Sequence, residues 1–225
     1  MSPAHLEAGG QFPRLSLTEI SGGPVAIPDP NGALTQLQFR RFAGCPIYNL
    51  HLRSISGRID EITAAGVREV VIFHSTPTEL RKYEDDLPFA VIGDPEKELY
   101  RRFGVDASAK AILKPAAWRA LPRGWWHAAR TAMTKRHAPL PANPTNGNLG
   151  LPADILIDAD GRILAAKYGE HAYDQWSVDE LLSLSRRYEA ASARLAARSA
   201  GDHPTTTGKR AQPRTLAVCA RWAFA

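Results

Sequence analysis

The order of apolar and polar residues along the chain predicts alternating strands and helices. Residues 34–42 (LTQLQFRRF) alternate apolar and polar side chains with the period of a strand, whereas 68–75 (REVVIFHS) and 89–94 (FAVIGD) are apolar runs typical of buried strands. Each run is followed by a predicted helix that begins near a proline, whose fixed φ and missing N–H suit the first turn. These helices cover about 46–65, 77–85 and 95–105. The alternation predicts a parallel or mixed sheet with helices on its faces.

The pattern changes in the last third of the chain. Residues 152–158 (PADILID) and 162–169 (RILAAKYG) form two apolar runs joined by a D-A-D-G turn, which predicts an antiparallel hairpin. A final helix is predicted over about 178–198, because Ser177 can cap its start and Glu180 follows three residues later.

Length and composition indicate one domain with appendages. The chain has 225 residues, 44% hydrophobic and 23% charged, which suffices for one buried core. We predict an N-terminal extension over 1–19, a globular domain over 20–198 with an insertion over 107–150, and a disordered tail over 199–225. No apolar run approaches the roughly 18 residues that span a bilayer, and the start lacks a signal-peptide pattern, so we expect a cytoplasmic protein.

The net charge of +5 is unevenly distributed along the chain. Residues 107–153 carry seven Lys or Arg and no Asp or Glu, and 199–225 carry four against one Asp. The insertion also contains Trp118, Trp125 and Trp126. We expect it to form a lid over the site, with a peripheral membrane contact through 114–136 as the alternative; a nucleic-acid partner is not expected.

Cys45 and Cys219 are the only thiols in the sequence. Two cysteines cannot build a disulfide framework, and no C-x-x-C pair is present to begin a zinc site, so we expect neither a metal nor a bound cofactor. Cys45 directly precedes Pro46 at a predicted helix start, where backbone N–H groups and the helix dipole stabilise a thiolate. Cys45 is therefore the predicted nucleophile, and a small buried apolar residue is the alternative.

Four segments of the sequence resemble the peroxiredoxin-like proteins of the alkyl hydroperoxide reductase and thiol-specific antioxidant superfamily. They are FRRFAGCPIYNLHLRS, VIFHSTPTELRKYEDDLPFAVIGDPEKELYRRFGV, GLPADILIDADGRILAAKYG and HAYDQWSVDELL, within about residues 20–190. The resemblance implies a thioredoxin-like α/β fold, with a central mixed sheet flanked by helices and a redox cysteine at Cys45. It also implies a cis-proline at Pro152 that turns the Leu151 backbone toward bound substrate; a trans proline that opens an edge strand is the alternative.

The sequence departs from the family beside Cys45. Relatives generally carry C-P-x-C, but Tyr48 stands in the second cysteine position, which excludes a dithiol cycle within the motif. True peroxiredoxins place Thr or Ser three residues before the nucleophile, where this chain has Phe42. We therefore expect single-cysteine reduction of a peroxide or disulfide, with Pro46 and Tyr48 among the substrate-binding residues. The reductant would be an external thiol, glutathione or a thioredoxin-like protein.

Two alternatives concern the reaction as a whole. Cys219 is the only protein thiol that could resolve oxidised Cys45, although we expect it to be an incidental tail cysteine. A redox-inactive thioredoxin-fold module that binds a protein partner is the alternative function, because the C-P-x-C motif has become C-P-x-Y.

Other polar residues near the predicted site receive smaller roles. Strand alternation places Arg40 and Arg41 on opposite faces, so only one of them can assist Cys45. His51 lies about 120° around the helix from Cys45, which indicates a surface or core-edge residue. His74 and the following Ser75-Thr76 pair can either line the rim of the site or cap elements. For the H-A-Y-D-Q-W segment over 171–176 we expect only capping and packing.

Overall fold

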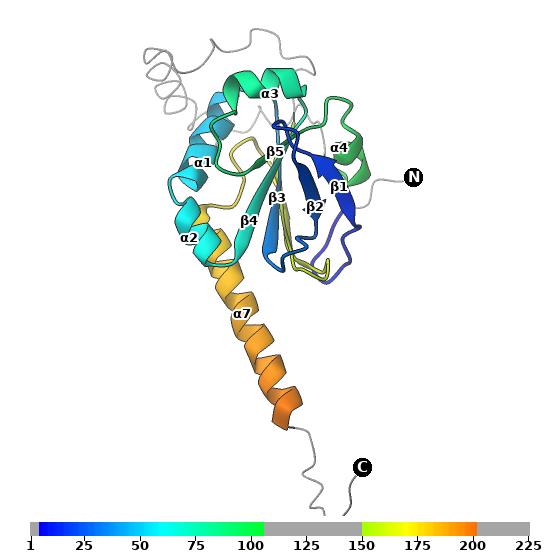
Figure 1. Ribbon diagram of the computed structural model, residues 1–225, viewed down its shortest axis with the longest axis vertical. Helices are drawn as coiled ribbons and strands as arrows, with labels where there is room; N and C mark the ends of the chain where they lie inside the picture. The colour runs from blue at the N-terminus through cyan, green and yellow to red at the C-terminus, as the bar shows by residue number, and fades with distance from the viewer. Residues whose placement is uncertain (1–4, 106–149, 202–225) are drawn as a thin grey trace, which may run out of the picture. The chain divides into compact units, whose positions relative to one another are not determined.

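The computed structural model describes residues 5–105 and 150–201 (Figure 1). The chain separates into two compact units, residues 1–190 and 191–225. In the second unit the described residues, 191–201, belong to helix α7 (Val178–Gly201). Apart from Gly150, the insertion predicted over 107–150 as a lid lies outside the described residues, as does the part of the predicted tail that carries Cys219. None of the described helices combines the length and the apolar character needed to cross a membrane.

A mixed five-stranded sheet forms the centre of the first unit, in the order β5-β4-β3-β6-β7. β3 (Leu34–Arg40) pairs in parallel with β4 (Val67–Phe73), which pairs in parallel with β5 (Ala90–Gly93). β6 (Ala153–Ile157) and β7 (Ile163–Tyr168) pair antiparallel, and β6 also pairs antiparallel with β3. The predicted mixed sheet and C-terminal hairpin are therefore confirmed.

Helices follow β3, β4 and β5, as the alternating pattern predicts. Their bounds are α1 (Pro46–Ser56), α2 (Ile59–Ala64), α3 (Pro77–Tyr83) and α4 (Glu98–Arg102). The helical stretch predicted over 46–65 is found as two helices, because Gly57 ends α1 and the chain restarts as α2. Thr76 forms a capping box with Glu79 at the start of α3, so Thr76 is a cap. Ser177 and Glu180 form the predicted capping box before α7.

The predicted N-terminal extension contains part of the fold. β1 (Leu15–Thr18) pairs antiparallel with β2 (Pro24–Ile27) in a separate two-stranded sheet. Phe12 is buried, and the Gly9 N–H donates to the Ile163 carbonyl over 2.8 Å. The boundary predicted at residue 20 is therefore not a structural boundary.

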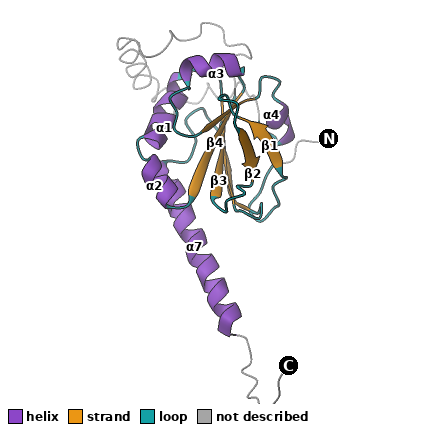
Figure 2. Ribbon diagram, in the orientation of Figure 1, coloured by secondary structure: helices purple, strands orange, loops and turns teal. Residues whose placement is uncertain are grey.

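Each face of the central sheet is covered by its own apolar core. α1, α2, α3 and the start of α7 cover one face, whereas the β1–β2 hairpin and α4 cover the other (Figure 2). The first core includes Leu52, Ile62, Leu80, Leu181, Val71 and Phe73, and the second includes Phe12, Ile27, Phe39, Ile72, Tyr100 and Ile155.

The face of β3 that lies toward α1 is polar and buried. Gln36, Gln38 and Arg40 alternate along this face and have at most 1% of their surface exposed. The Arg40 guanidinium lies 2.6 Å from Asp154 Oδ1 on β6, with both side chains fully buried. The other Asp154 oxygen accepts a hydrogen bond from the Trp176 backbone N–H over 2.9 Å. Asp154 therefore connects the end of β3 to the segment before α7.

Breaking this ion pair should be costly. Asp154→Asn leaves the Arg40 charge buried without its counter-ion, and we expect the free energy of unfolding to fall by about 3–5 kcal/mol. The control is Asp179→Asn, which removes an 82% exposed partner of Arg58 and should have no measurable effect. Urea unfolding of both variants tests the comparison, and equal losses would contradict it.

Candidate active site

Cys45 occupies the start of α1, as predicted. It is the N-cap residue, with φ −63° and ψ 119°, and Pro46 follows as the first helical residue. The Cys45 carbonyl accepts the Asn49 N–H over 2.9 Å, which closes the first turn of the helix. An N-cap side chain lies beside backbone N–H groups that the helix itself does not pair, where a negative charge is stabilised.

An apolar cluster encloses Cys45, which is 3% exposed. Cys45 packs with Phe42, Tyr48 and Ala172. Within the described ranges the Tyr48 hydroxyl is buried without a hydrogen-bond partner. Burial and the neighbouring Cys45 charge raise the pKa of Tyr48 far above its ordinary value, so the phenol keeps its proton. The residue in the second cysteine position therefore offers a hydrogen-bond donor that the protein does not use.

Two side chains from the α3 region hold the loop before Cys45. Ser75 Oγ accepts the Ala43 N–H over 3.0 Å, and Glu84 Oε1 accepts the Gly44 N–H over 2.9 Å. Gly44 has a φ of +74°, and a Cβ there would lie 2.8 Å from Tyr83 Cδ1. This position therefore requires glycine. Ser75 serves as a loop anchor.

Glu84 is a site residue that sequence reasoning missed. It is 2% exposed, and burial raises its pKa to about 8 even though the Gly44 N–H bond opposes the shift. At neutral pH it is therefore a neutral acid. Nothing in the local sequence separates Glu84 from Asp85 and Asp86, because its partner Gly44 lies 40 residues earlier.

The structure places Arg40 and Arg41 in different surroundings. Arg40 lies on the buried polar face with Asp154, and its guanidinium lies 3.3 Å from His51 Nε2. Burial and the Arg40 charge hold the pKa of His51 well below its usual range. The prediction that His51 is a surface or core-edge residue is wrong, because the polar face of β3 is covered by α1. Arg41 remains as the arginine that can serve the Cys45 site.

The predicted cis-proline is not found at Pro152. The cis bond within the described residues lies between Ile27 and Pro28, and the Leu151–Pro152 bond is trans. The Pro152 carbonyl accepts the Gly169 N–H over 2.8 Å, and its ring leaves no room for a Cβ at Gly169. Pro152 is thus a trans proline that leads the extended chain into β6, as in the alternative, but β6 lies between β3 and β7 and is not the edge strand that the alternative expected.

The segment between β7 and α7 contributes Ala172 to the Cys45 cluster. Asp174 organises this segment: its carboxylate lies 2.8 Å from Lys167 Nζ and accepts the Glu170 N–H over 2.9 Å. The H-A-Y-D-Q-W motif therefore packs, as predicted, and in doing so it helps to enclose Cys45. The cap of α7 is Ser177, the residue after the motif.

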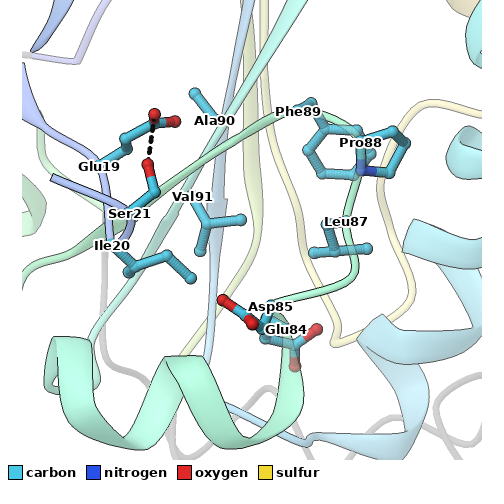
Figure 3. A pocket seen from close by; sticks show the side chains of 10 residues that line it. All are labelled: Glu19, Ile20, Ser21, Glu84, Asp85, Leu87, Pro88, Phe89, Ala90 and Val91. Atoms are coloured by element: carbon cyan, nitrogen blue, oxygen red, sulfur yellow. Dashed lines mark hydrogen bonds between the residues drawn. The ribbon is translucent and has the colours of Figure 1, made fainter. Parts of the chain in front are cut away.

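A pocket of about 340 Å³ lies along β5 (Figure 3). Residues 19–21 and most of 84–91 line it, and Ser21 Oγ donates to Glu19 Oε1 over 2.5 Å. No member of the Cys45 cluster lines this pocket. Glu84 is common to the pocket and to the Cys45 loop, but the pocket is not the thiol site.

Residues 54–171 match the model of a family described as AhpC/TSA antioxidant enzyme. The chain belongs to the AhpC/TSA family. The match begins after Cys45, so the membership does not by itself assign the thiol. No curated protein sequence matches the chain significantly.

Solved structures support the thioredoxin-like fold. The chain is similar to peroxidoxin BcpB from Mycobacterium tuberculosis, with a TM-score of 0.58 and 15% identity over 81% of this chain and 98% of that one. The chain is also similar to a thiol peroxidase from Chromobacterium violaceum, with a TM-score of 0.55 and 16% identity over 84% of this chain and 91% of that one. For the reduced 2-Cys peroxiredoxin of Plasmodium vivax, the TM-score is 0.57 and the identity 11%, over 84% of this chain and 99% of that one. At these identities the likeness establishes the fold alone.

The protonation of Glu84 predicts a pH dependence of stability. Its carboxyl binds a proton more tightly in the folded chain than in the unfolded chain, where the pKa is near 4.5. Its stabilising contribution is therefore complete below pH 4.5 and is lost as the pH rises through about 8. The free energy of unfolding of the wild type should fall between about pH 6.5 and 8.5.

Glu84→Gln keeps an oxygen for the Gly44 N–H but cannot ionise, so its free energy of unfolding should fall by about 2 kcal/mol less over this interval. Exposed Glu96 provides the control, and Glu96→Gln should behave as the wild type. Urea unfolding at both pH values measures the difference, and a Glu84→Gln slope equal to that of the wild type would refute the assigned protonation.

Proposed function

We propose that this AhpC/TSA family member reduces peroxides through Cys45 as its single redox cysteine, with an external thiol as reductant. The observation that carries the proposal is the position of Cys45 at the N-terminus of α1, beside the unused hydroxyl of Tyr48. Family membership supports a peroxide substrate and a thiol reductant in general. We propose glutathione or a thioredoxin-like protein as the reductant and the cytoplasm as the compartment.

The proposed reaction begins when the Cys45 thiolate attacks one oxygen of the peroxide. The O–O bond breaks, the sulfur is oxidised by two electrons to a sulfenic acid, and the departing oxygen takes a proton to become an alcohol or water. An external thiol then forms a mixed disulfide with Cys45 and releases water. A second external thiol displaces the Cys45 thiolate and leaves as the oxidised disulfide.

In the proposed reaction Tyr48 donates the hydrogen bond to the peroxide that Phe42, in the position of the family's Thr or Ser, cannot donate. A phenol that keeps its proton can donate to a peroxide oxygen beside the thiol, and its charge-neutral state preserves the thiolate. Pro46 and the Leu151 backbone remain proposed contacts of the bound substrate, and Pro152 holds that backbone at the start of β6.

The alternative is a redox-inactive module that binds a protein partner. The burial of Cys45, at 3% exposure among apolar side chains, favours it, because structural cysteines are typically enclosed in this way. The two functions differ in what happens to Cys45 when peroxide is added.

Cys45→Ser should abolish thiol-dependent peroxide consumption while leaving the fold intact, since oxygen replaces sulfur with little change in volume. Consumption of hydrogen peroxide and of an organic hydroperoxide is measured with glutathione or thioredoxin as reductant. The matched control, Cys219→Ser, should retain the wild-type rate. Activity that survives in Cys45→Ser would reject the nucleophile.

Tyr48→Phe separates the proposed donor role from a packing role. The variant should lower the rate of Cys45 oxidation by roughly 10- to 100-fold, because one donor to the reacting oxygen is lost. Its free energy of unfolding should not fall, because the hydroxyl is buried without a partner among the described residues. An unchanged oxidation rate in stopped-flow measurements would remove Tyr48 from the reaction.

A further inference from the structure

Arg41 is a buried cation without a counter-ion in the described part of the chain. It is 5% exposed, its Nε has no hydrogen-bond partner, and no carboxylate of the described ranges lies within ion-pair distance. The guanidinium instead lies over the ring of Phe42, 5.3 Å from its centroid. Arg40, the preceding residue, also has an Nε without a partner in this part of the chain, but Asp154 neutralises its charge.

The remaining sequence offers few internal partners. Outside the described residues the only acidic side chains are Asp106 and Asp202. An unpaired buried charge is unfavourable for folding, so a protein that keeps one at a candidate site has a use for it. We therefore expect a negatively charged ligand to serve as the counter-ion of Arg41.

Arg41 stands where α/β proteins bind ligands. β3 and β4 are parallel (Figure 1). Arg40 lies opposite Phe73 in the register, so Arg41 and His74 are the residues that follow the carboxyl ends of these two strands. The His74 N–H donates to the Arg41 carbonyl over 3.0 Å. Gly150 completes the group, since a Cβ there would lie 3.2 Å from Arg41 Cγ and 3.6 Å from His74 Nε2.

His74 adds a polar ring to this edge without a second charge. Burial, then the charges of Lys97 and Arg41, lower the pKa of His74 to about 4, while Glu79 acts in the opposite direction. The imidazole is thus neutral at physiological pH.

Arg41 contacts the apolar cluster that encloses Cys45, through the ring of Phe42. The Cys45 charge raises the pKa of Tyr48 and the Arg41 charge lowers it. Arg41 also covers Phe42, which packs in the Cys45 cluster. An anionic group bound by Arg41 would therefore lie next to the cluster that encloses the thiol.

We propose that Arg41, flanked by His74 and Gly150, forms an anion subsite that selects substrates carrying a carboxylate, either an acidic hydroperoxide or an acidic disulfide. The proposal rests on the proposed role of Cys45 as the nucleophile. The planar fork of an arginine matches the two oxygens of a carboxylate, which makes Arg41 a specificity-determining residue.

Two alkylating reagents test the subsite. Iodoacetate and iodoacetamide both form a C–S bond with Cys45 and release iodide, but only iodoacetate is an anion. The ratio of their rate constants cancels any effect on the fraction of thiolate, because both reagents react with the same sulfur. Mass spectrometry of the Cys45 peptide from the full chain gives both rates. The native ratio should exceed the ratio in the urea-unfolded chain by about tenfold.

Variants assign the effect to one side chain. Arg41→Met should bring the ratio down to the unfolded value, and Arg41→Lys, which keeps the charge without the fork, should retain part of it. The matched control is Arg102→Met, because Arg102 also lies over the following ring, 5.4 Å from the centroid of Phe103. The control should leave the ratio unchanged. The urea midpoint of Arg41→Met should not fall, since no described ion pair is lost.

The outcomes separate the subsite from the proposed function. A native ratio equal to the unfolded one, or an equal loss in Arg102→Met, overturns the subsite. An Arg41→Met variant that slows both reagents to the same degree also overturns it, because this result indicates an effect on the thiolate. If native Cys45 reacts with neither reagent, both the subsite and the nucleophile are refuted. If native Cys45 reacts with iodoacetamide but the ratio of the two rate constants equals that of the unfolded chain, only the subsite is refuted.

Discussion

The enclosed pair of Arg40 and Asp154 is the interaction on which the candidate site depends. A charge pair with no access to water is favourable only when its remaining donors and acceptors are also satisfied. Asp154 meets this requirement by accepting the Trp176 N–H. Arg40 meets it in part: it donates to two backbone carbonyls, whereas its Nε has no partner among the described residues. Because Trp176 precedes α7 and Arg40 ends β3, the pair fixes both segments that enclose Cys45.

Two consecutive arginines at the end of β3 thus have different physical roles. Arg40 points into the interior, where the Asp154 carboxylate neutralises its charge. Arg41 follows the carboxyl end of β3, where no described carboxylate neutralises its charge and its guanidinium lies over Phe42. The first contributes to the fold and the second bears on recognition. Glu84 accepts the Gly44 N–H just before α1, and because it is protonated at neutral pH it adds no negative charge near the start of this helix.

The elements with strong local patterns were predictable, because strand period and proline-led helix starts depend on neighbouring residues alone. The burial of the polar face of β3 was not, because it depends on the packing of α1 against that face. The end of α1 at Gly57 has a local signal, the glycine itself, which the prediction over 46–65 missed. In the site, Cys45 followed from its place before a proline. Glu84 and the trans bond at Pro152 did not, since they depend on partners far away in sequence.

Trapping of the oxidised thiol tests the central claim most directly. The folded protein and the urea-unfolded chain are each treated with one equivalent of hydrogen peroxide in the presence of dimedone, which captures sulfenic acids, and the Cys45 peptide is followed by mass spectrometry. If the start of α1 activates Cys45, the adduct forms at Cys45 at least about tenfold faster in the folded protein. An equal or slower rate in the folded protein would show that Cys45 is a structural residue and would contradict the account.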